Sequence, residues 1–184
     1  YLKRMIWPFR RKSKKRMARI VIDEPITSST RVSVLKALKQ IEDREFPALI
    51  VRIDSPGGTV GDSQEIYSAI KRLKDKGCKV IASFGNISAS GGVYIGVASD
   101  KIVANPGTIT GSIGVIIRGN NLSELLDKIG IKFETVKSGV FKDILSPDKP
   151  LSEEGRGLLQ GLIDESYKQF TEAVAEGRNL PVEE

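Results

Sequence analysis

The serines of one glycine-rich turn are the strongest candidates for covalent chemistry in this sequence. The turn spans residues 88–92 (SASGG) and is placed where a strand would pass into a helix. A serine at such a junction presents its hydroxyl at the positive end of the helix, and the N–H of Gly91 points the same way. This is the arrangement of a nucleophile elbow without the usual G-x-S-x-G sequence. The alternative interpretation is that Ser88 or Ser90 only caps the helix.

The base that would activate a serine cannot be a histidine, because the 184 residues contain none. This absence excludes a Ser-His-Asp triad, a Cys-His dyad and zinc sites that require histidine. A lysine that is desolvated in a cleft can be neutral at about pH 7 and accept the serine proton. The candidate is Lys142 in the loop 137–143 (KSGVFKD), and the hydroxyl of Ser112 in residues 110–114 (TGSIG) could orient its amine. The alternative is that Lys142 is a solvated surface charge.

A third glycine-rich turn, residues 54–58 (DSPGG), follows a run of apolar residues. Pro56 fixes the backbone there, while Gly57 and Gly58 allow backbone N–H groups to approach a ligand closely. Ligands of parallel sheets bind beyond the carboxyl ends of the strands, so we expect the three turns to line one site. A turn with no further role is the alternative. No cofactor and no metal ion are predicted.

The elements that must position these turns alternate between short β-branched runs and longer helical periods. This alternation predicts an α/β fold with a mostly parallel sheet flanked by helices. The expected strands are residues 18–22, 47–53, 79–83, 101–104, 112–117 and 132–137, and helices are expected from about residue 29 and at 63–76, 88–98, 122–129 and 152–177. The length is typical of one domain, which we place at residues 18–184. A single cysteine, Cys78, excludes an internal disulfide.

The net charge of +6 is located in an N-terminal arm, which we place at residues 1–17. Residues 1–19 hold nine basic and no acidic residues, so residues 20–184 carry 20 basic and 23 acidic ones. With Trp7 and Phe9 beside the basic run, residues 1–16 are predicted to bind an anionic membrane surface; a basic tail without a partner is the alternative. Nucleic-acid binding is not expected from a mildly acidic domain. No apolar run reaches the ~20 residues of a membrane span, so we expect a peripheral membrane or cytoplasmic protein.

Four motifs taken together resemble one known family. They are residues 53–58 (IDSPGG), 86–95 (NISASGGVYI), 110–115 (TGSIGV) and 137–143 (KSGVFKD), in this order. The set is similar to the signal peptide peptidase A (SppA) family, in particular its small single-domain bacterial and cyanobacterial forms. These are Ser-Lys proteases of the ClpP/crotonase superfamily. The resemblance covers roughly residues 18–181 and implies a ClpP-like spiral of ββα units.

The resemblance also assigns roles to individual residues. By position, Ser90 would be the nucleophile, Lys142 the general base, and Ser112 the hydroxyl that positions the lysine, while Gly58 and Gly91 would supply the oxyanion-hole N–H groups. The implied function is a serine endopeptidase that cleaves extended, apolar peptides such as remnant signal peptides. Members form rings or domes in which serine and lysine come from neighbouring domains or subunits, so a homo-oligomer with shared sites is expected.

Two other functions compete with this one. A crotonase-type acyl-CoA enzyme would share the fold and the paired N–H groups, but such enzymes generally use glutamate acid-base residues. A non-catalytic scaffold at a membrane would need only the arm and the oligomer. Many SppA proteins have an N-terminal transmembrane helix where this sequence has a basic arm, and their pattern continues past residue 184, so the domain is expected to be short at its C-terminus.

Overall fold

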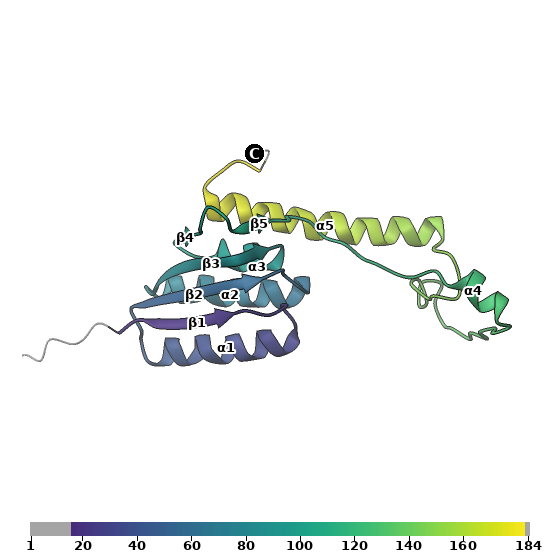
Figure 1. Ribbon diagram of the computed structural model, residues 1–184, viewed down its shortest axis with the longest axis horizontal. Coiled ribbons are helices and arrows are strands. Elements are labelled where there is room, and N and C mark those ends of the chain that lie inside the picture. The colour runs from purple at the N-terminus through teal and green to yellow at the C-terminus, as the bar shows by residue number, and fades with distance from the viewer. Residues whose placement is uncertain (1–15, 183–184) are drawn as a thin grey trace, which may run out of the picture.

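A parallel five-stranded sheet forms the centre of the computed structural model, which describes residues 16–182 (Figure 1). The strands are β1 (Ala18–Ile22), β2 (Ala48–Ser55), β3 (Lys79–Ala89), β4 (Lys101–Val103) and β5 (Ile109–Gly111). The helices are α1 (Ser28–Asp43), α2 (Val60–Asp75), α3 (Gly91–Gly96), α4 (Ser123–Lys128) and α5 (Glu153–Arg178). The predicted lipid-binding arm lies almost entirely outside the described residues.

The strands follow the order β1-β2-β3-β4, and β5 pairs with the last part of β3. Every pair is parallel, which requires a crossover between β1 and β2 and another between β2 and β3; α1 and α2 supply them. β3 is longer than the predicted strand 79–83 because it has two successive partners on one side. Its residues 81–83 pair with β4, and residues 87–89 pair with β5. This extension carries β3 as far as the predicted serine turn.

Apolar side chains at helical spacing hold α1 and α2 against the sheet. Val34, Leu38 and Ile41 of α1 and Ile66 and Ile70 of α2 are buried in one cluster with the inward residues of the first three strands. Spacings of three and four residues place such side chains on one face of a helix. The sheet, α1 and α2 therefore share one core, and half-buried Tyr67 and Ile102 connect it to a second cluster that includes α5; these parts, residues 16–111 with the second half of α5, are called the body below.

The long helix α5 belongs only partly to this core. Phe170 and Ala173 in its second half pack with Tyr94 of α3 and with Val97, which directly follows α3. A Cβ on Gly177 would lie 2.3 Å from the carbonyl oxygen of Val97, so only glycine allows α5 to approach α3 this closely. The first half of α5 continues past the sheet toward α4 (Figure 1). This helix connects the body to a segment that lies apart from it.

That segment, residues 112–150, is called the distal segment below. None of its residues is buried. The predicted strands 112–117 and 132–137 are wrong, because both stretches lack regular structure; the strand in this region is β5, at Ile109–Gly111. A strand must pair its backbone N–H and C=O groups with a neighbour, and none of the strands described within residues 16–182 lies alongside either stretch. The helix predicted at 122–129 is present as α4.

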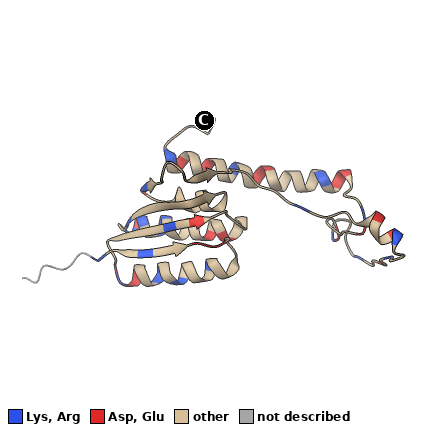
Figure 2. Cartoon of the chain, in the orientation of Figure 1, with Lys and Arg blue, Asp and Glu red and all other residues tan. Residues whose placement is uncertain are grey.

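Charged residues of both signs are mixed along the helices and strands in the view of Figure 2. None of the helices described between residues 16 and 182 has both the length and the apolar content to cross a bilayer.

Candidate active site

Ser90 occupies the single-residue junction between β3 and α3. Its backbone has φ 50° and ψ −119°, a region that residues other than glycine rarely adopt. Holding it there costs about 1–3 kcal/mol, and such strain is concentrated at active sites. The Ser90 N–H donates to the carbonyl of Gly111 at 2.9 Å, and the Ser90 carbonyl accepts from the N–H of Tyr94 at 3.0 Å. The surrounding backbone therefore holds Ser90 in a conformation that serine rarely adopts.

The hydroxyl of Ser90 is not engaged in holding α3. Ser90 occupies the N-cap position, but its side chain makes no capping hydrogen bond, so the capping interpretation is wrong for this residue. Ser88 does not cap the helix either, since its side chain is fully buried and its Oγ has no hydrogen-bond partner within residues 16–182. Ser90 is partly exposed and its hydroxyl is available for chemistry.

The turn at residues 54–58 packs directly on the serine turn. A Cβ on Gly57 would lie 2.8 Å from the Cβ of Ser90 and 2.7 Å from the nitrogen of Gly91. A Cβ on Gly91 would lie 2.4 Å from Oγ of Ser63 and 3.4 Å from the nitrogen of Gly58. Neither position accommodates a side chain, so both glycines are required by close approach. Two of the three predicted turns therefore meet at Ser90.

Two backbone N–H groups at this meeting point are free. Hydrogen bonds from Ile26 N–H to the Gly57 carbonyl (2.9 Å) and from Thr59 N–H to the Ile26 carbonyl (3.0 Å) hold the first turn. Within the described part of the chain, the N–H groups of Gly58 and Gly91 donate no hydrogen bond. Gly91 is the first residue of α3, and Gly58 lies two residues before α2, so helix N-termini favour negative charge here. Two unpaired donors beside a hydroxyl can stabilise an oxyanion.

Ser112 is brought next to the site by the pairing of β5 with β3. Ala89 lies opposite Gly111 in the register, so Ser112 is one residue beyond the strand pair, as Ser90 is. Its backbone is also left-handed, with φ 53°. The chain then passes Ser90, because Gly114 and Val115 line the same pocket as Ser90. The other walls of this pocket are Gly58, Val60, Ser63, Gly91, Tyr94, Ser166 and Phe170.

Lys142 is the predicted site residue that the structure does not bring to Ser90. It is exposed in the distal segment, in the stretch between α4 and α5, which Figure 1 shows at the far end of the molecule. Ser166 of α5 still lines the serine pocket, but the helix from there back to Glu153 is about 20 Å long at ~1.5 Å per residue. A general base must come within about 3 Å of the proton that it removes. One chain in this conformation therefore holds Ser90 and the free N–H groups of Gly58 and Gly91 together, with the lysine elsewhere.

Sequence reasoning missed a charge cluster around the lysine loop. Lys137 Nζ lies 2.7 Å from Oδ1 of Asp143, and Lys149 Nζ lies 2.5 Å from Oδ2. Hydrogen bonds from Lys137 and then Lys149 lower the pKa of Asp143 to about 2. Lys142 makes no ion pair within residues 16–182. The spacing of six residues on either side of Asp143 was the available signal, but it corresponds to no regular element.

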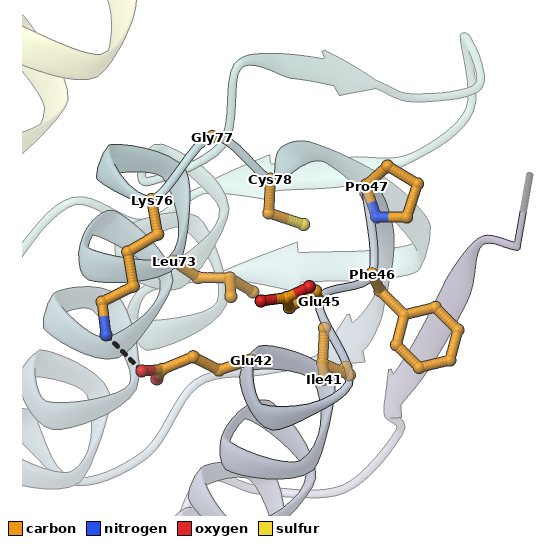
Figure 3. A pocket seen from close by; sticks show the side chains of 9 residues that line it. All are labelled: Ile41, Glu42, Glu45, Phe46, Pro47, Leu73, Lys76, Gly77 and Cys78. Atoms are coloured by element: carbon orange, nitrogen blue, oxygen red, sulfur yellow. Dashed lines mark hydrogen bonds and ion pairs between the residues drawn. The ribbon is translucent and has the colours of Figure 1, made fainter.

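A separate cavity of about 410 Å³ lies at the opposite edge of the sheet (Figure 3). Its lining includes Phe46 and Pro47 before β2, Gly77 and Cys78 before β3, and the ion pair of Glu42 with Lys76. Burial raises the pKa of the Cys78 thiol, which keeps it in the unreactive protonated form. The cavity is at the amino ends of the strands, whereas ligands of parallel sheets bind at the carboxyl ends, where Ser90 lies.

The parallel sheet with its crossover helices and strained serine turn has the ClpP-like fold predicted above. The structure superposes on a ClpP1 point mutant from Listeria monocytogenes with a TM-score of 0.59 at 16% identity, covering 90% of this chain and 74% of that chain. At this identity the likeness establishes the fold alone. The chain belongs to peptidase family S49, whose pattern matches residues 72–184. The resemblance to the SppA family is thereby confirmed.

Individual relatives agree with this assignment. The chain is 61% identical over 179 residues to the putative protease slr0021 of Synechocystis sp., covering 97% of this chain and 64% of that protein. It is 37% identical over 143 residues to the chloroplastic serine protease SPPA of Arabidopsis thaliana, covering 77% of this chain and 21% of that protein. Protease 4 of Salmonella typhi is 35% identical over 142 residues, covering 77% and 23%. The chain thus spans less than two thirds of each of these relatives.

Proposed function

We propose that this chain is the catalytic unit of a serine endopeptidase with Ser90 as the nucleophile. The observation that carries the proposal is the geometry at Ser90: a strained turn, a hydroxyl that makes no cap, and the free N–H groups of Gly58 and Gly91 beside it. Membership of a peptidase family supports the same chemistry. A crotonase-type acyl-CoA enzyme would use the same fold and N–H groups, but family S49 favours the peptidase.

In the proposed mechanism, neutral Lys142 removes the proton of Ser90 while the serine oxygen attacks the scissile carbonyl. The N–H groups of Gly58 and Gly91 stabilise the negative charge that develops on the carbonyl oxygen, an effect worth about 10²–10³ in kcat per donor. Ser112 orients the lysine amine. The protonated amine then donates to the leaving nitrogen, and water releases the acyl-enzyme.

Lys142 reaches Ser90 from a second copy of the chain in this proposal. The separation of the two residues within one chain supports this, and so does the apolar surface around the lysine. Large apolar side chains of the distal segment are exposed: Ile113, Ile116, Ile117, Leu122, Leu125, Ile129, Ile131, Phe133, Val136, Val140, Phe141 and Leu145. An apolar surface of this extent is typical of a protein interface. A closed ring or dome of identical subunits would cover it and complete each site.

The identity of the base is supported by the charges of the loop. Residues 137–150 hold three lysines, of which Lys137 and Lys149 are both ion-paired with Asp143. Lys142 has no such partner within residues 16–182. It is therefore the lysine of this segment whose amine is not engaged by a carboxylate.

We propose extended, mostly apolar peptides as substrates, such as remnants of signal peptides. The pocket beside Ser90 is small, about 20 Å³, but Val60, Tyr94, Val115 and Phe170 among its walls give the surface next to the serine an apolar character. Peripheral attachment through residues 1–16 would bring the enzyme to such peptides. Sedimentation with anionic liposomes tests that attachment, which should weaken as salt rises and disappear when residues 1–16 are deleted.

The decisive experiment separates the two catalytic residues. Ser90→Ala and Lys142→Ala should each reduce peptide cleavage by at least about 10³-fold. Ser68→Ala on the exposed face of α2 and Lys132→Ala in the distal segment are the matched controls and should keep full activity. Wild-type activity in either catalytic variant would contradict the proposal.

Mixing the two inactive variants tests where the lysine comes from. Oligomers that contain both chains combine an intact Ser90 with an intact Lys142 from another copy, so activity should return. No recovery in mixed oligomers would show that each site is completed within one chain. Turnover of acyl-CoA thioesters without peptide cleavage would instead support the crotonase-type alternative.

A further inference from the structure

Asp143 ties together the irregular loop that carries Lys142. One oxygen of its carboxylate accepts a hydrogen bond from Lys137 Nζ at 2.7 Å, and the other accepts one from Lys149 Nζ at 2.5 Å. Lys137 Nζ also donates to the carbonyl of Val140 at 3.0 Å. The side chain of Asp143 is only 18% exposed although no residue of the distal segment is buried. The carboxylate thus joins the start, the middle and the end of the loop.

The two ion pairs add to a sparse set of backbone hydrogen bonds in the loop. Residues 137–150 contain no strand and no helix, and the end of the loop is bonded to the residue before α4, where Leu122 N–H donates to the Pro147 carbonyl at 2.7 Å. Their other backbone hydrogen bonds are short-range turns such as Lys142 N–H to the Gly139 carbonyl at 3.2 Å. A turn fixes only neighbouring residues, whereas the two lysines link positions six residues before and after Asp143. Because Lys142 directly precedes Asp143, its backbone is held between both links. Reactive groups must be placed to within a fraction of an ångström for efficient catalysis.

The ion pairs of Asp143 with Lys137 and Lys149 also affect the electrostatic environment of Lys142. Asp143 is the carboxylate adjacent to Lys142 in sequence, and an ion pair between the two would favour the protonated amine. Both oxygens of Asp143 are instead occupied by Lys137 and Lys149, and the pKa of Asp143 is lowered to about 2. The hydrogen bond to Asp143 also raises the pKa of Lys149, which therefore remains a cation.

We propose that Asp143, bonded to Lys137 and Lys149, is a positioning residue that holds the loop with Lys142 unpaired. The proposal rests on Lys142 being the base of the peptidase proposed above. Asp143 touches neither substrate nor the reacting serine; it acts through the lysine that precedes it. The ion pairs of Asp143 therefore act in the chain that supplies Lys142 to a site, not in the chain that supplies Ser90.

The primary test compares three variants in the full chain. Asp143→Asn keeps the shape but loses the charge, and kcat should fall about 10- to 100-fold with KM within about twofold, because the pocket beside Ser90 is unchanged. Asp143→Glu retains charge and both acceptor oxygens and should restore most of kcat. Asp43→Asn removes the exposed ion pair of Asp43 with Lys39 on α1 and should have no effect. Wild-type kcat in Asp143→Asn would overturn the proposal.

A mixing experiment distinguishes positioning from a general loss of folding. The double variant Ser90→Ala/Asp143→Asn supplies only lysine, so mixing it with Lys142→Ala should recover about 10- to 100-fold less activity than Ser90→Ala does. The double variant Lys142→Ala/Asp143→Asn supplies only serine, and mixing it with Ser90→Ala should give full recovery. If Asp143→Asn reduced the recovered activity equally in the lysine-supplying and the serine-supplying chain, Asp143 would only support folding or assembly, and the proposal would be overturned.

The two proposals fail in different ways. If Ser90→Ala and Lys142→Ala do not complement each other, the shared site is wrong, and the kcat of Asp143→Asn still tests the positioning role within one chain. If they complement each other fully and Asp143→Asn remains active, only the role of Asp143 is wrong. Should Asp143→Asn aggregate, the pair Lys137→Met and Lys149→Met removes the same two bonds while leaving the carboxylate, and the same fall in kcat is expected.

Discussion

The body and the distal segment of this chain are stabilised in different ways. In the body, Ile53, Ile70 and Val80 are completely buried, and the sheet and its helices share one core. In the distal segment no residue is buried, and Val136 is fully exposed. The half of the proposed site that is built on the body, at Ser90, is strained and closely packed. The proposed half that carries Lys142 lies on a surface that one chain leaves uncovered.

This difference suggests how the enzyme could be controlled. A preorganised oxyanion site is effective only if its donors are fixed before the reaction, and in our proposal the packing of the body fixes the N–H groups of Gly58 and Gly91 in each single chain. The lysine needs a partner copy in our proposal, so an isolated chain would carry the serine with these N–H groups and no base. Assembly would then switch on the chemistry, and unassembled chains would be inactive.

The largest effect should be seen when the same substitution, Ile to Ala, is made in each region and the free energy of unfolding is compared. Ile70→Ala removes a fully buried side chain of α2 and should lower the free energy of unfolding by about 2–5 kcal/mol. Ile116→Ala changes a side chain that is 72% exposed and should alter the unfolding of a dilute chain by less than about 0.5 kcal/mol. Urea unfolding measures both.

Self-association should show the reverse order, with the larger effect in Ile116→Ala and the smaller one in Ile70→Ala. Ile116→Ala should weaken self-association in sedimentation velocity, because it removes apolar area from the proposed interface. Ile70→Ala should leave association unchanged where the chain is folded. Equal losses of unfolding free energy would show that the distal segment packs within its own chain and would remove the contrast.

A second prediction tests the close packing on the serine side. Gly91→Ala would place a Cβ 2.4 Å from Oγ of Ser63, displacing the oxyanion donor, so kcat should fall at least about 100-fold. Gly107→Ala, between β4 and β5, meets no atom within 4 Å and should stay within about twofold of wild type. Peptide cleavage by the two purified variants decides it. An active Gly91→Ala enzyme would mean that the body does not hold a preorganised site.

A third prediction concerns pH and the lysine side. The base acts as a free amine, so kcat/KM should show a limb that rises by up to about tenfold per pH unit within the range from about pH 6 to pH 10. The pKa of Asp143 is lowered to about 2, below its usual value, so its ion pairs are present above its unfolded pKa and are lost only as the pH falls toward 2. Asp143 therefore contributes nothing to the rise. A flat profile would contradict a lysine base.

The body was largely predictable from sequence, because its patterns reflect contacts within one chain. The β-branched runs marked β1 to β4 but not β5, and the strand-to-helix position of Ser90 followed from an apolar run that ends in glycines. The glycines required by close approach, such as Gly91, also mark that site. Each of these features is local or is repeated at a regular period.

The distal segment was not predictable in the same way. The stretch 132–137 (KFETVK) alternates polar and apolar residues as a half-buried strand does, yet it has no partner strand among the described residues. Its pattern indicates burial that one chain does not provide. The bonds of Asp143 with Lys137 and Lys149 span an irregular loop, where no periodicity connects the partners. Residues 1–15, which carry most of the predicted arm, lie outside the described residues.

The smallest expected effect is a pH dependence of the free energy of unfolding that comes from Cys78, a residue of the body. It is the single cysteine of the chain, and it is 5% exposed at the cavity of Figure 3. Burial raises the pKa of its thiol, so the folded state retains the proton to higher pH than the unfolded state does. The free energy of unfolding should therefore fall slightly as the pH rises above the unfolded thiol pKa of about 8.5, and Cys78→Ala should remove that fall.

The labelling rate of this thiol separates folding from assembly. An aromatic disulfide reagent reacts with the thiolate, so native Cys78 should react far more slowly at about pH 8 than the urea-unfolded chain does. Dilution that dissociates oligomers should lower the specific activity, because each site loses its lysine, but should leave the native labelling rate unchanged, because α2 and β3 of the same chain cover the thiol. If labelling accelerated in step with the loss of activity, the body would itself depend on a partner, and the two regions would share one source of stability.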